Sequence, residues 1–289
     1  MSRTVGIAVT GATKRAMSTS GKTINAGELF VSSDLSKRYA QFRPKLPVEH
    51  VNTIVELLGR KPGVWVDVGC GPGTSTQQIV GHADTIVGVD ISETQVEVAR
   101  QTHQHPSLSF VQGTCDKLPA EDCSVDVITA VQAAHYFDLP AFFKEVDRVL
   151  KPGGVVGLVS INLPACLDSV TMDTARLCMF DLVNQYGSPN KVRLLFENYK
   201  NLVVPYPTRK DHMVDIFTTW TLDDYVDVCM TYSTIDRMIK RKGLTIKQGR
   251  DFYVQLLREG GMTELDSKSV YTWSHSCALV TASKPCRNG

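Results

Sequence analysis

The sequence has no long hydrophobic run. None of its apolar stretches approaches the roughly 20 residues that a helix needs to cross a bilayer, so no membrane association is expected. It also lacks internal repeats and low-complexity linkers, which argues against a repeat architecture. The 289 residues instead fit one large α/β domain with insertions, or one domain with a small cap.

Patterns typical of metal sites and disulfide frameworks are missing too. The eight cysteines are irregularly spaced, and none forms a Cys-x-x-Cys pair. No His/Cys cluster has zinc-ligand spacing, so no metal is predicted. A chain of this length does not need disulfides for stability. We therefore interpret the cysteines as free thiols in a reducing compartment.

The chain has no strong charge of either sign. Its net charge is +1, but segment 1–27 contains no acidic residue and four basic ones, Arg3, Lys14, Arg15 and Lys22. Without those four charges the remainder carries −3, that is, +1 less four. Binding to a phosphate backbone uses a positive field. We therefore expect a small-molecule substrate, no nucleic acid, and a monomer or homodimer.

Residues 1–27 are basic, rich in Ser and Thr, and lack the apolar core of a secretory signal. We interpret them as a flexible tail on a cytoplasmic protein. The same composition is typical of mitochondrial transit peptides, which leaves a mitochondrial location as the alternative.

Residues 47–162 alternate between helical and strand patterns. Helices are expected over 47–60, 74–81, 92–103 and 142–150, the last ended by residues 151–154, and strands over 64–68, 85–90, 108–112, 125–131 and 155–161. The strands are short, apolar and β-branched, as are strands covered on both faces. The pattern predicts a Rossmann-like doubly wound, mostly parallel sheet of about seven strands.

The pattern changes after residue 162. Residues 163–265 read mostly as helix, with a break at Pro205 and Pro207, and two closing strands follow at 270–273 and 276–281. We therefore expect one domain over 28–289, with residues 163–265 as a helical cap inserted before the last strands.

A glycine turn follows the strand at 64–68. Asp67 precedes Gly69, Gly71 and Gly73, whose G-x-G-x-G spacing differs from the G-x-G-x-x-G of NAD proteins. Glycines permit unusual backbone angles and let a ligand approach closely. Asp90 ends the second strand, where an acidic side chain can accept both hydroxyls of a ribose. These residues indicate a nucleoside-containing ligand at the carboxyl ends of the strands.

Together these motifs resemble class I S-adenosylmethionine-dependent methyltransferases. The resemblance covers about residues 33–162 and is carried by segments 67–73, 118–119, 124–126 and 148–154 together with Asp90. Within that superfamily, segments 39–44 and 132–138 resemble the branch of trans-aconitate methyltransferase and related small-molecule methyltransferases.

The resemblance implies S-adenosyl-L-methionine as the cofactor and assigns roles to matching positions. Glycines 69, 71 and 73 would line its methionine and ribose parts, and Asp67 would orient its amino group. The other cofactor residues implied are Asp90 on the ribose, Ile91, Cys115 and Asp116 at the adenine, Gln132 near the methionine, and Tyr39 and Arg43 over the carboxylate. Thr114 stands where many relatives have the aspartate that binds the adenine amino group. Thr114, Asp116 or a backbone carbonyl could therefore fill that role.

Methyl transfer from a sulfonium needs an aligned nucleophile and little else. The resemblance favours O-methylation of a carboxylate, which needs no general base when ionised. For a hydroxyl or ammonium acceptor, His135 is the candidate base, and its alternative is a structural wall histidine. Tyr136, Arg209, Trp220 and Tyr232 are candidate acceptor contacts. The alternatives are methylation of nitrogen, sulfur, carbon or a macromolecule, and a non-catalytic cofactor-binding regulator.

Overall fold

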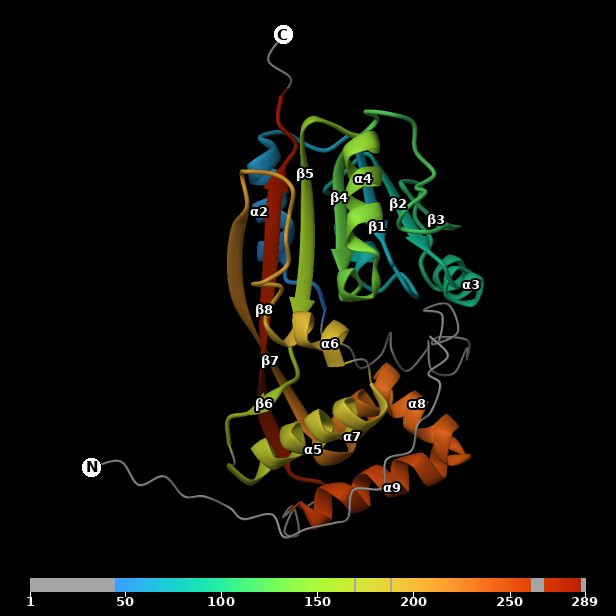
Figure 1. Ribbon diagram of the computed structural model, residues 1–289, viewed down its shortest axis with the longest axis vertical. Coiled ribbons are helices and arrows are strands. Elements are labelled where there is room, and N and C mark those ends of the chain that lie inside the picture. The colour runs from blue at the N-terminus through green and yellow to red at the C-terminus, as the bar shows by residue number, and fades with distance from the viewer. Residues whose placement is uncertain (1–44, 169, 188, 261–267, 287–289) are drawn as a thin grey trace, which may run out of the picture.

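The sheet forms the upper body of the molecule. The computed structural model describes residues 45–168, 170–187, 189–260 and 268–286 (Figure 1). The strands are β1 (Val64–Val68), β2 (Thr85–Asp90), β3 (Leu108–Gln112), β4 (Val125–Val131), β5 (Leu150–Ile161), β6 (Ala165–Cys166), β7 (Lys210–Thr221) and β8 (Val270–Ser283). Their order is β3-β2-β1-β4-β5-β8-β6, with β7 also paired to β8. The first five are parallel, as predicted, whereas β6 and β7 run antiparallel to β8. The Rossmann-like fold is confirmed.

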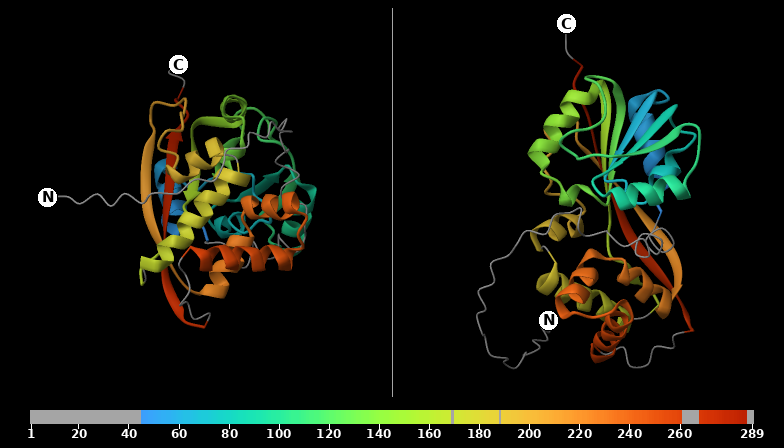
Figure 2. Two further views of the ribbon diagram at one scale, coloured as in Figure 1. Left: turned by 60° about the horizontal axis from the view of Figure 1, so that its bottom comes forward. Right: turned by 90° about the vertical axis from the view of Figure 1, so that its right-hand side faces the viewer.

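Helices cover both faces of this sheet. They are α2 (Val48–Leu58), α3 (Glu93–Thr102) and α4 (Leu139–Val149), with the short turns η2 (Thr76–Ile79) and η3 (Ala134–Tyr136). Helix α2 packs Ile54 with Val127 of β4, and α4 packs Phe142 with Ile128 on the other face (Figure 2). All seven residues of β4 are buried. Because both of its faces are covered, β4 reads as a continuous apolar run.

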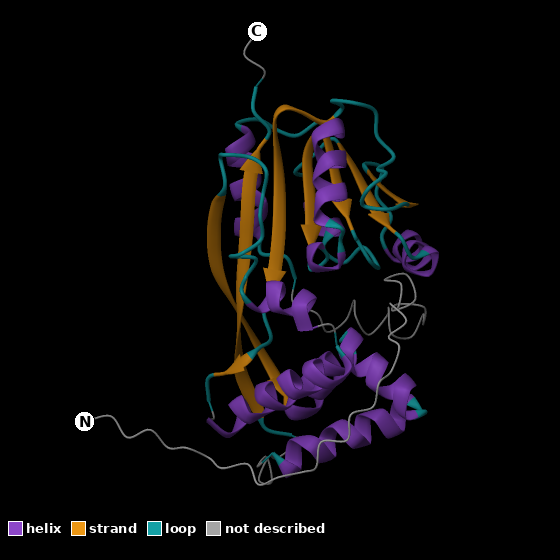
Figure 3. Ribbon diagram, viewed as in Figure 1, coloured by secondary structure: helices purple, strands orange, loops and turns teal. Residues whose placement is uncertain are grey.

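A helical cap lies beyond the carboxyl ends of the parallel strands (Figure 3). It contains α5 (Val170–Tyr186), α6 (Pro189–Phe196), α7 (Leu222–Met230), α8 (Ser233–Lys242) and α9 (Ile246–Glu259). Helices α7 and α9 each begin with a capping box, at Thr221 and Thr245. The cap has its own core, in which Trp273 of β8 stacks on Tyr225 at 4.4 Å between ring centroids.

The boundaries differ from the sequence prediction in four places. Strand β7 was missed: its alternating half-buried and exposed residues lie within the segment expected to be helical. Residues 270–281 form part of one 14-residue strand, because Ser274 and Ser276 interrupt the apolar pattern and not the ladder. The expected helix at 74–81 is a four-residue 3₁₀ turn. Residues 151–154 already belong to β5, which begins as soon as α4 ends.

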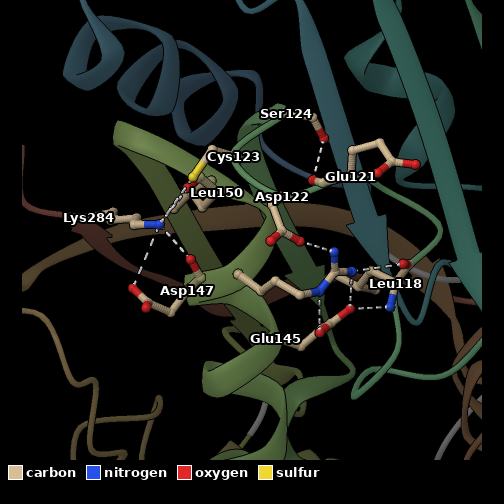
Figure 4. Close-up of polar contacts among 10 residues, drawn as sticks. Leu118, Glu121, Asp122, Cys123, Ser124, Glu145, Asp147, Leu150 and Lys284 are labelled. Carbon is tan, nitrogen blue, oxygen red and sulfur yellow. Dashed lines mark hydrogen bonds and ion pairs between the residues drawn. The ribbon is translucent and has the colours of Figure 1, made fainter.

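A polar network joins the end of α4 to the loop before β4 and to the end of β8 (Figure 4). Arg148 donates to Glu145 and Asp122, while Glu145 accepts the Leu118 amide at 2.7 Å. The Lys284 ammonium is buried and donates to the backbone carbonyl of Leu150 at 2.8 Å. These bonds hold together the strand ends that lie opposite the cap.

No helix of the described residues is long and apolar enough to span a bilayer. Within those same residues, no cluster of three or more His, Cys, Asp or Glu side chains is arranged to hold a metal. All eight cysteines lie in the described part of the chain, and none forms a disulfide.

Asp126, in β4, holds the start of β1 against β4. Its side chain has no exposed surface, and one oxygen accepts the amides of Gly63 and Val64, both at 2.9 Å. Arg60 and Lys151 donate to the same carboxylate. Burial alone would raise the pKa of Asp126, but the bonds from Arg60, Val64 and Lys151 lower it.

Asp126→Ala should lower the free energy of unfolding by about 1.5–3 kcal/mol, because two partly buried amides lose a charged acceptor. The matched variant Arg60→Ala removes a half-exposed partner and should cost at most about 1 kcal/mol. Urea unfolding at neutral pH measures both. Equal losses of unfolding free energy in the two variants would contradict the role given to Asp126 at the start of β1.

Candidate functional site

A cleft of about 460 Å³ opens at the carboxyl ends of β1, β2 and β4. The described residues that line it are Asp67 to Pro72, Thr74, Ser75, Val89 to Ile91, Gln95, Gly113 to Asp116, Val131 to Ala133 and Tyr136 to Asp138. Ligands of open parallel sheets bind at this edge. The cleft therefore brings together most of the predicted cofactor residues.

The glycine turn forms the floor of the cleft. Gly69, Gly71 and Gly73 all have positive φ, at 73°, 55° and 81°. A Cβ on Gly69 would lie 2.5 Å from the Cβ of Ala133, whereas Gly71 has open space beside it. Gly73 was expected to line the cofactor as well, but it is not among the described residues that line the cleft. Its Cβ position is filled by Phe110 and His103, so it permits close packing of the turn against β3.

Asp90 connects the glycine turn to the start of α3. Its carboxylate accepts the Gly71 amide at 2.8 Å and the Ser92 amide at 2.9 Å. Burial raises the pKa of Asp90, while these bonds oppose the rise. Ser92 holds the N-cap position of α3, but its hydroxyl makes no cap bond. Asp90 has further lone pairs for a ligand in the cleft.

Asp67 is held by hydroxyl groups that the sequence analysis did not single out. Thr76 donates to one carboxylate oxygen at 2.6 Å and Thr129 to the other at 2.8 Å. The Trp65 indole in turn donates to Thr129 at 3.0 Å. Burial raises the pKa of Asp67 to about 6, although both hydroxyl bonds lower it.

The wall after β3 holds the predicted adenine residues. Ile91, Thr114, Cys115 and Asp116 all line the cleft, and the Ile91 side chain is 39% exposed. The Thr114 carbonyl accepts the amide of Lys117 in a tight turn. This arrangement does not select among the three candidates for the adenine amino group.

Three polar side-chain atoms of the cleft are buried and have no hydrogen-bond partner among the described residues. They are Thr74 Oγ1, Gln95 Oε1 and Gln132 Oε1. Gln132 has a positive φ of 56°, and its Nε2 donates to the Ile161 carbonyl at 2.6 Å. Buried polar atoms normally have partners, so orphaned ones in a cleft indicate a site that fits a polar ligand. Sequence reasoning assigned no role to Thr74, which directly follows Gly73, or to Gln95, the third residue of α3.

His135 lies beside the cleft and not in its lining. Its side chain is buried, and its Nδ1 lies 2.9 Å from the hydroxyl of Tyr199. Its ring packs at 4.2 Å from that of Tyr136, which does line the cleft. The Tyr136 hydroxyl lies 3.0 Å from Ser233 Oγ of α8, which links the cleft to the cap.

The other predicted acceptor residues lie elsewhere. Arg209 was expected in the helical cap, but it directly precedes β7 and donates to Asp211 and to the carbonyls of Tyr199, Lys200 and Leu202. Its role at the acceptor therefore stays a prediction. Trp220 packs on Trp273 and His275 in the cap, and Tyr232 precedes α8. Tyr39 and Arg43 lie outside the described residues.

Comparison with known proteins agrees with this geometry. Residues 66–158 match the family model of the methyltransferase domain. A Dictyostelium discoideum protein named as a methyltransferase is 25% identical over 200 residues, covering 65% of this chain and 75% of its own. A solved structure from Anaeromyxobacter dehalogenans, described as a type II methyltransferase, aligns with a TM-score of 0.68 and 23% identity, covering 85% of this chain and all of its own.

One further relative has a named acceptor. The sterol 24-C-methyltransferase of Aspergillus fumigatus is 36% identical over 130 residues, which cover 42% of this chain and 34% of that protein. The match spans about a third of that relative, so it informs the domain and not the acceptor. The domain match, the shared fold and the cleft at the carboxyl ends of the strands lead to one conclusion: the chain carries a methyltransferase domain over residues 66–158, built to use S-adenosylmethionine.

Proposed function

We propose that this enzyme methylates a small-molecule acid on a carboxylate oxygen. The observation that carries the proposed cofactor site is the set of three orphaned polar atoms in one cleft with Asp67 and Asp90. The choice of a carboxylate rests on the resemblance of segments 39–44 and 132–138 to small-molecule carboxylate methyltransferases. The sterol-methylating relative makes carbon the competing acceptor atom.

Each wall of the cleft would hold one part of the cofactor. Asp90 would accept from the ribose hydroxyls, with Gly69 and Gly71 allowing a close approach. Asp67 and Gln132 Oε1 would accept from the methionine ammonium. Ile91 and Cys115 would pack on the adenine, with its amino group bound by Thr114, Asp116 or a backbone carbonyl. Tyr39 and Arg43 are proposed to close over the cofactor carboxylate. When bound, the cofactor supplies a methyl group on an electron-poor sulfonium.

The acceptor would enter between the cleft and the cap. Tyr136 stands at that boundary, because it lines the cleft and contacts Ser233 of α8. Burial raises the pKa of a carboxylic acid that enters such a site. His135 would take the proton and leave the acceptor ionised and aligned. Trp220 and Tyr232 would reach it only from farther into the cap.

Asp90→Ala should weaken S-adenosylmethionine binding by about 10- to 100-fold, because a charged acceptor for the ribose hydroxyls is lost. The matched control is Asp84→Ala at the opposite end of β2, where Asp84 makes an exposed ion pair with Lys61. Calorimetric titration of both variants measures the effect. Unchanged affinity of a folded Asp90→Ala protein would remove the ribose assignment.

Cofactor affinity should fall as the pH drops below about 6, because protonation of Asp67, whose pKa is raised to about 6, removes the charge that binds the ammonium. Above that pH the carboxylate is ionised and affinity should reach a plateau. Titrations between pH 5 and about 7.5 should show the inflection in the wild type and not in Asp67→Asn. An inflection that persists in Asp67→Asn would assign the titration to another group.

The acceptor class can be tested with cofactor carrying a radioactive methyl group and a panel of small carboxylic acids. A methyl ester releases labelled methanol in alkali, whereas carbon- and nitrogen-linked methyl groups do not. We expect alkali-labile label, and His135→Gln should reduce turnover without changing cofactor affinity. Alkali-stable product would overturn the carboxylate. Cofactor binding with no labelled product across the panel would favour a non-catalytic role.

A further inference from the structure

A relay of two hydrogen bonds connects the core of the sheet with Asp67. Trp65 and Asp67 lie on one face of β1, because alternate residues of a strand share a face. Thr129 of β4 pairs directly with Asp67 in the parallel register. The Trp65 indole donates to Thr129 Oγ1 at 3.0 Å, and Thr129 donates to Asp67 Oδ1 at 2.8 Å. All three residues are at most 1% exposed, so both bonds of the relay form away from bulk water.

The chemistry of the indole sets the direction of the relay. An indole N–H can only donate, so Trp65 occupies a lone pair of Thr129 Oγ1. The hydrogen of the Thr129 hydroxyl is then directed at Asp67 Oδ1. The second carboxylate oxygen accepts from the buried Thr76 hydroxyl of η2 at 2.6 Å. Each oxygen of Asp67 therefore receives a hydroxyl hydrogen from a buried threonine.

This arrangement opposes protonation of the Asp67 carboxylate. A proton on Oδ1 would compete with the Thr129 hydrogen, and a proton on Oδ2 would compete with the Thr76 hydrogen. If Thr129 turned to accept that proton as well as the indole N–H, its own hydrogen would lose the carboxylate that accepts it. A buried donor without an acceptor costs free energy, and hydrogen bonds to a carboxylate favour its charged form. The geometry therefore favours an ionised Asp67.

The ionisable groups near Asp67 do not supply this stabilisation. Burial raises the pKa of Asp67 and the Asp90 carboxylate of β2 raises it further, whereas the bonds from Thr76 and Thr129 lower it. The Cys70 thiol is buried and its pKa is raised well above the ordinary value, so it stays neutral. The described residues that line the cleft include no Lys, Arg or His. Hydroxyl groups, and not cations of the cleft, are what offset the burial of Asp67.

We propose that Thr129, oriented by Trp65, is a positioning residue that keeps the Asp67 carboxylate ionised and aligned for the cofactor. This rests on the proposed function, in which Asp67 accepts from the methionine ammonium. Rotation of the carboxylate would break a hydroxyl bond, so its oxygens are aligned before the cofactor binds, and such preorganisation favours binding. Neither Trp65 nor Thr129 is among the described residues that line the cleft. The cofactor site is thus adjusted from beneath, by side chains in the core of the sheet.

The ionisation of Asp67 can be measured in the full-length protein without cofactor. ¹³C NMR of carboxyl-labelled aspartate between about pH 4.5 and about pH 8 follows the titration, and Asp67→Asn identifies the Asp67 signal. We expect a wild-type midpoint at about pH 6. Thr129→Val should raise the midpoint by about one pH unit, because a hydrogen bond to the charged form is lost. Thr129→Ser keeps the hydroxyl and should keep the wild-type midpoint. Trp65→Phe should give a smaller rise, because the Thr129 hydroxyl is then free to turn.

The matched control is Thr281→Val in β8. Thr281 is also buried, and it lies in the same row of the sheet as Thr129, because Gly157 of β5 pairs with both threonines. Its hydroxyl contacts His212 and the Lys210 carbonyl, and not a carboxylate. This variant therefore removes a buried hydroxyl without touching the relay, and its Asp67 midpoint should equal that of the wild type.

Three results of the NMR titration would overturn the inference. They are an unchanged midpoint in Thr129→Val, a rise in Thr281→Val as large as that in Thr129→Val, and an unchanged midpoint in Trp65→Phe. The last result also decides the matter if Thr129→Val does not fold, because Trp65→Phe leaves the threonine in place. A raised midpoint in Thr129→Ser would assign the effect to packing and would count against the relay as well.

Calorimetric titration with S-adenosylmethionine separates this inference from the proposed function. A midpoint of about 7 leaves Asp67 about one-tenth ionised at pH 6, compared with about half in the wild type, so the affinity of Thr129→Val should fall about fivefold there and recover above about pH 8. An equal loss at every pH would indicate a structural defect and would overturn the inference. A raised Asp67 midpoint with wild-type affinity at every pH would instead contradict the proposed function, because Asp67 would then not bind the ammonium.

Discussion

The ladder between β7 and β8 is the constraint on which the rest of the site depends. Twelve residue pairs join the two strands, from Lys210 with Thr281 to Thr221 with Val270. One end of β8 pairs with β5 inside the main sheet, and the other places Trp273 in the core of the cap. The β7–β8 ladder is therefore shared by the main sheet and the cap. The cap cannot rotate away from the sheet without bending a paired strand, so its helices stay over the carboxyl ends of β1, β2 and β4 (Figure 1).

Because the ladder is shared by the sheet and the cap, a few side-chain contacts are enough to define the boundary between the cleft and the cap. Tyr136 reaches Ser233 from the core side, and Tyr199 reaches His135 from the α6–β7 connection. Each contact bridges segments more than 60 residues apart in sequence. The stabilisation that these two contacts provide therefore depends on the β7–β8 ladder. When the ladder forms, the entropy of closing such long loops has already been lost.

The sequence predicted well what depends on local pattern. Five short apolar runs became β1 to β5, and the glycine turn and Asp90 came together as their spacing indicates. It failed where tertiary pairing decides the outcome. Strand β7 has only one half-buried face, so its two-residue alternation was not recognised within the segment expected to be helical. Because β7 was not predicted, Arg209 was assigned to the helical cap. Thr76, Thr129 and Tyr199 carry no motif; only folding brings their hydroxyls to Asp67 and His135.

Charge explains why this cleft suits a sulfonium cofactor and not a dinucleotide. The described residues that line it include Asp67, Asp90, Asp116 and Asp138 and no Lys, Arg or His. A pyrophosphate would meet uncompensated negative charge there, whereas a sulfonium and an ammonium would be attracted. The same balance constrains an anionic acceptor. An acid entering the bare cleft would be repelled by these carboxylates, so the bound cofactor must supply the positive charge it approaches. Cofactor binding should then precede acceptor binding.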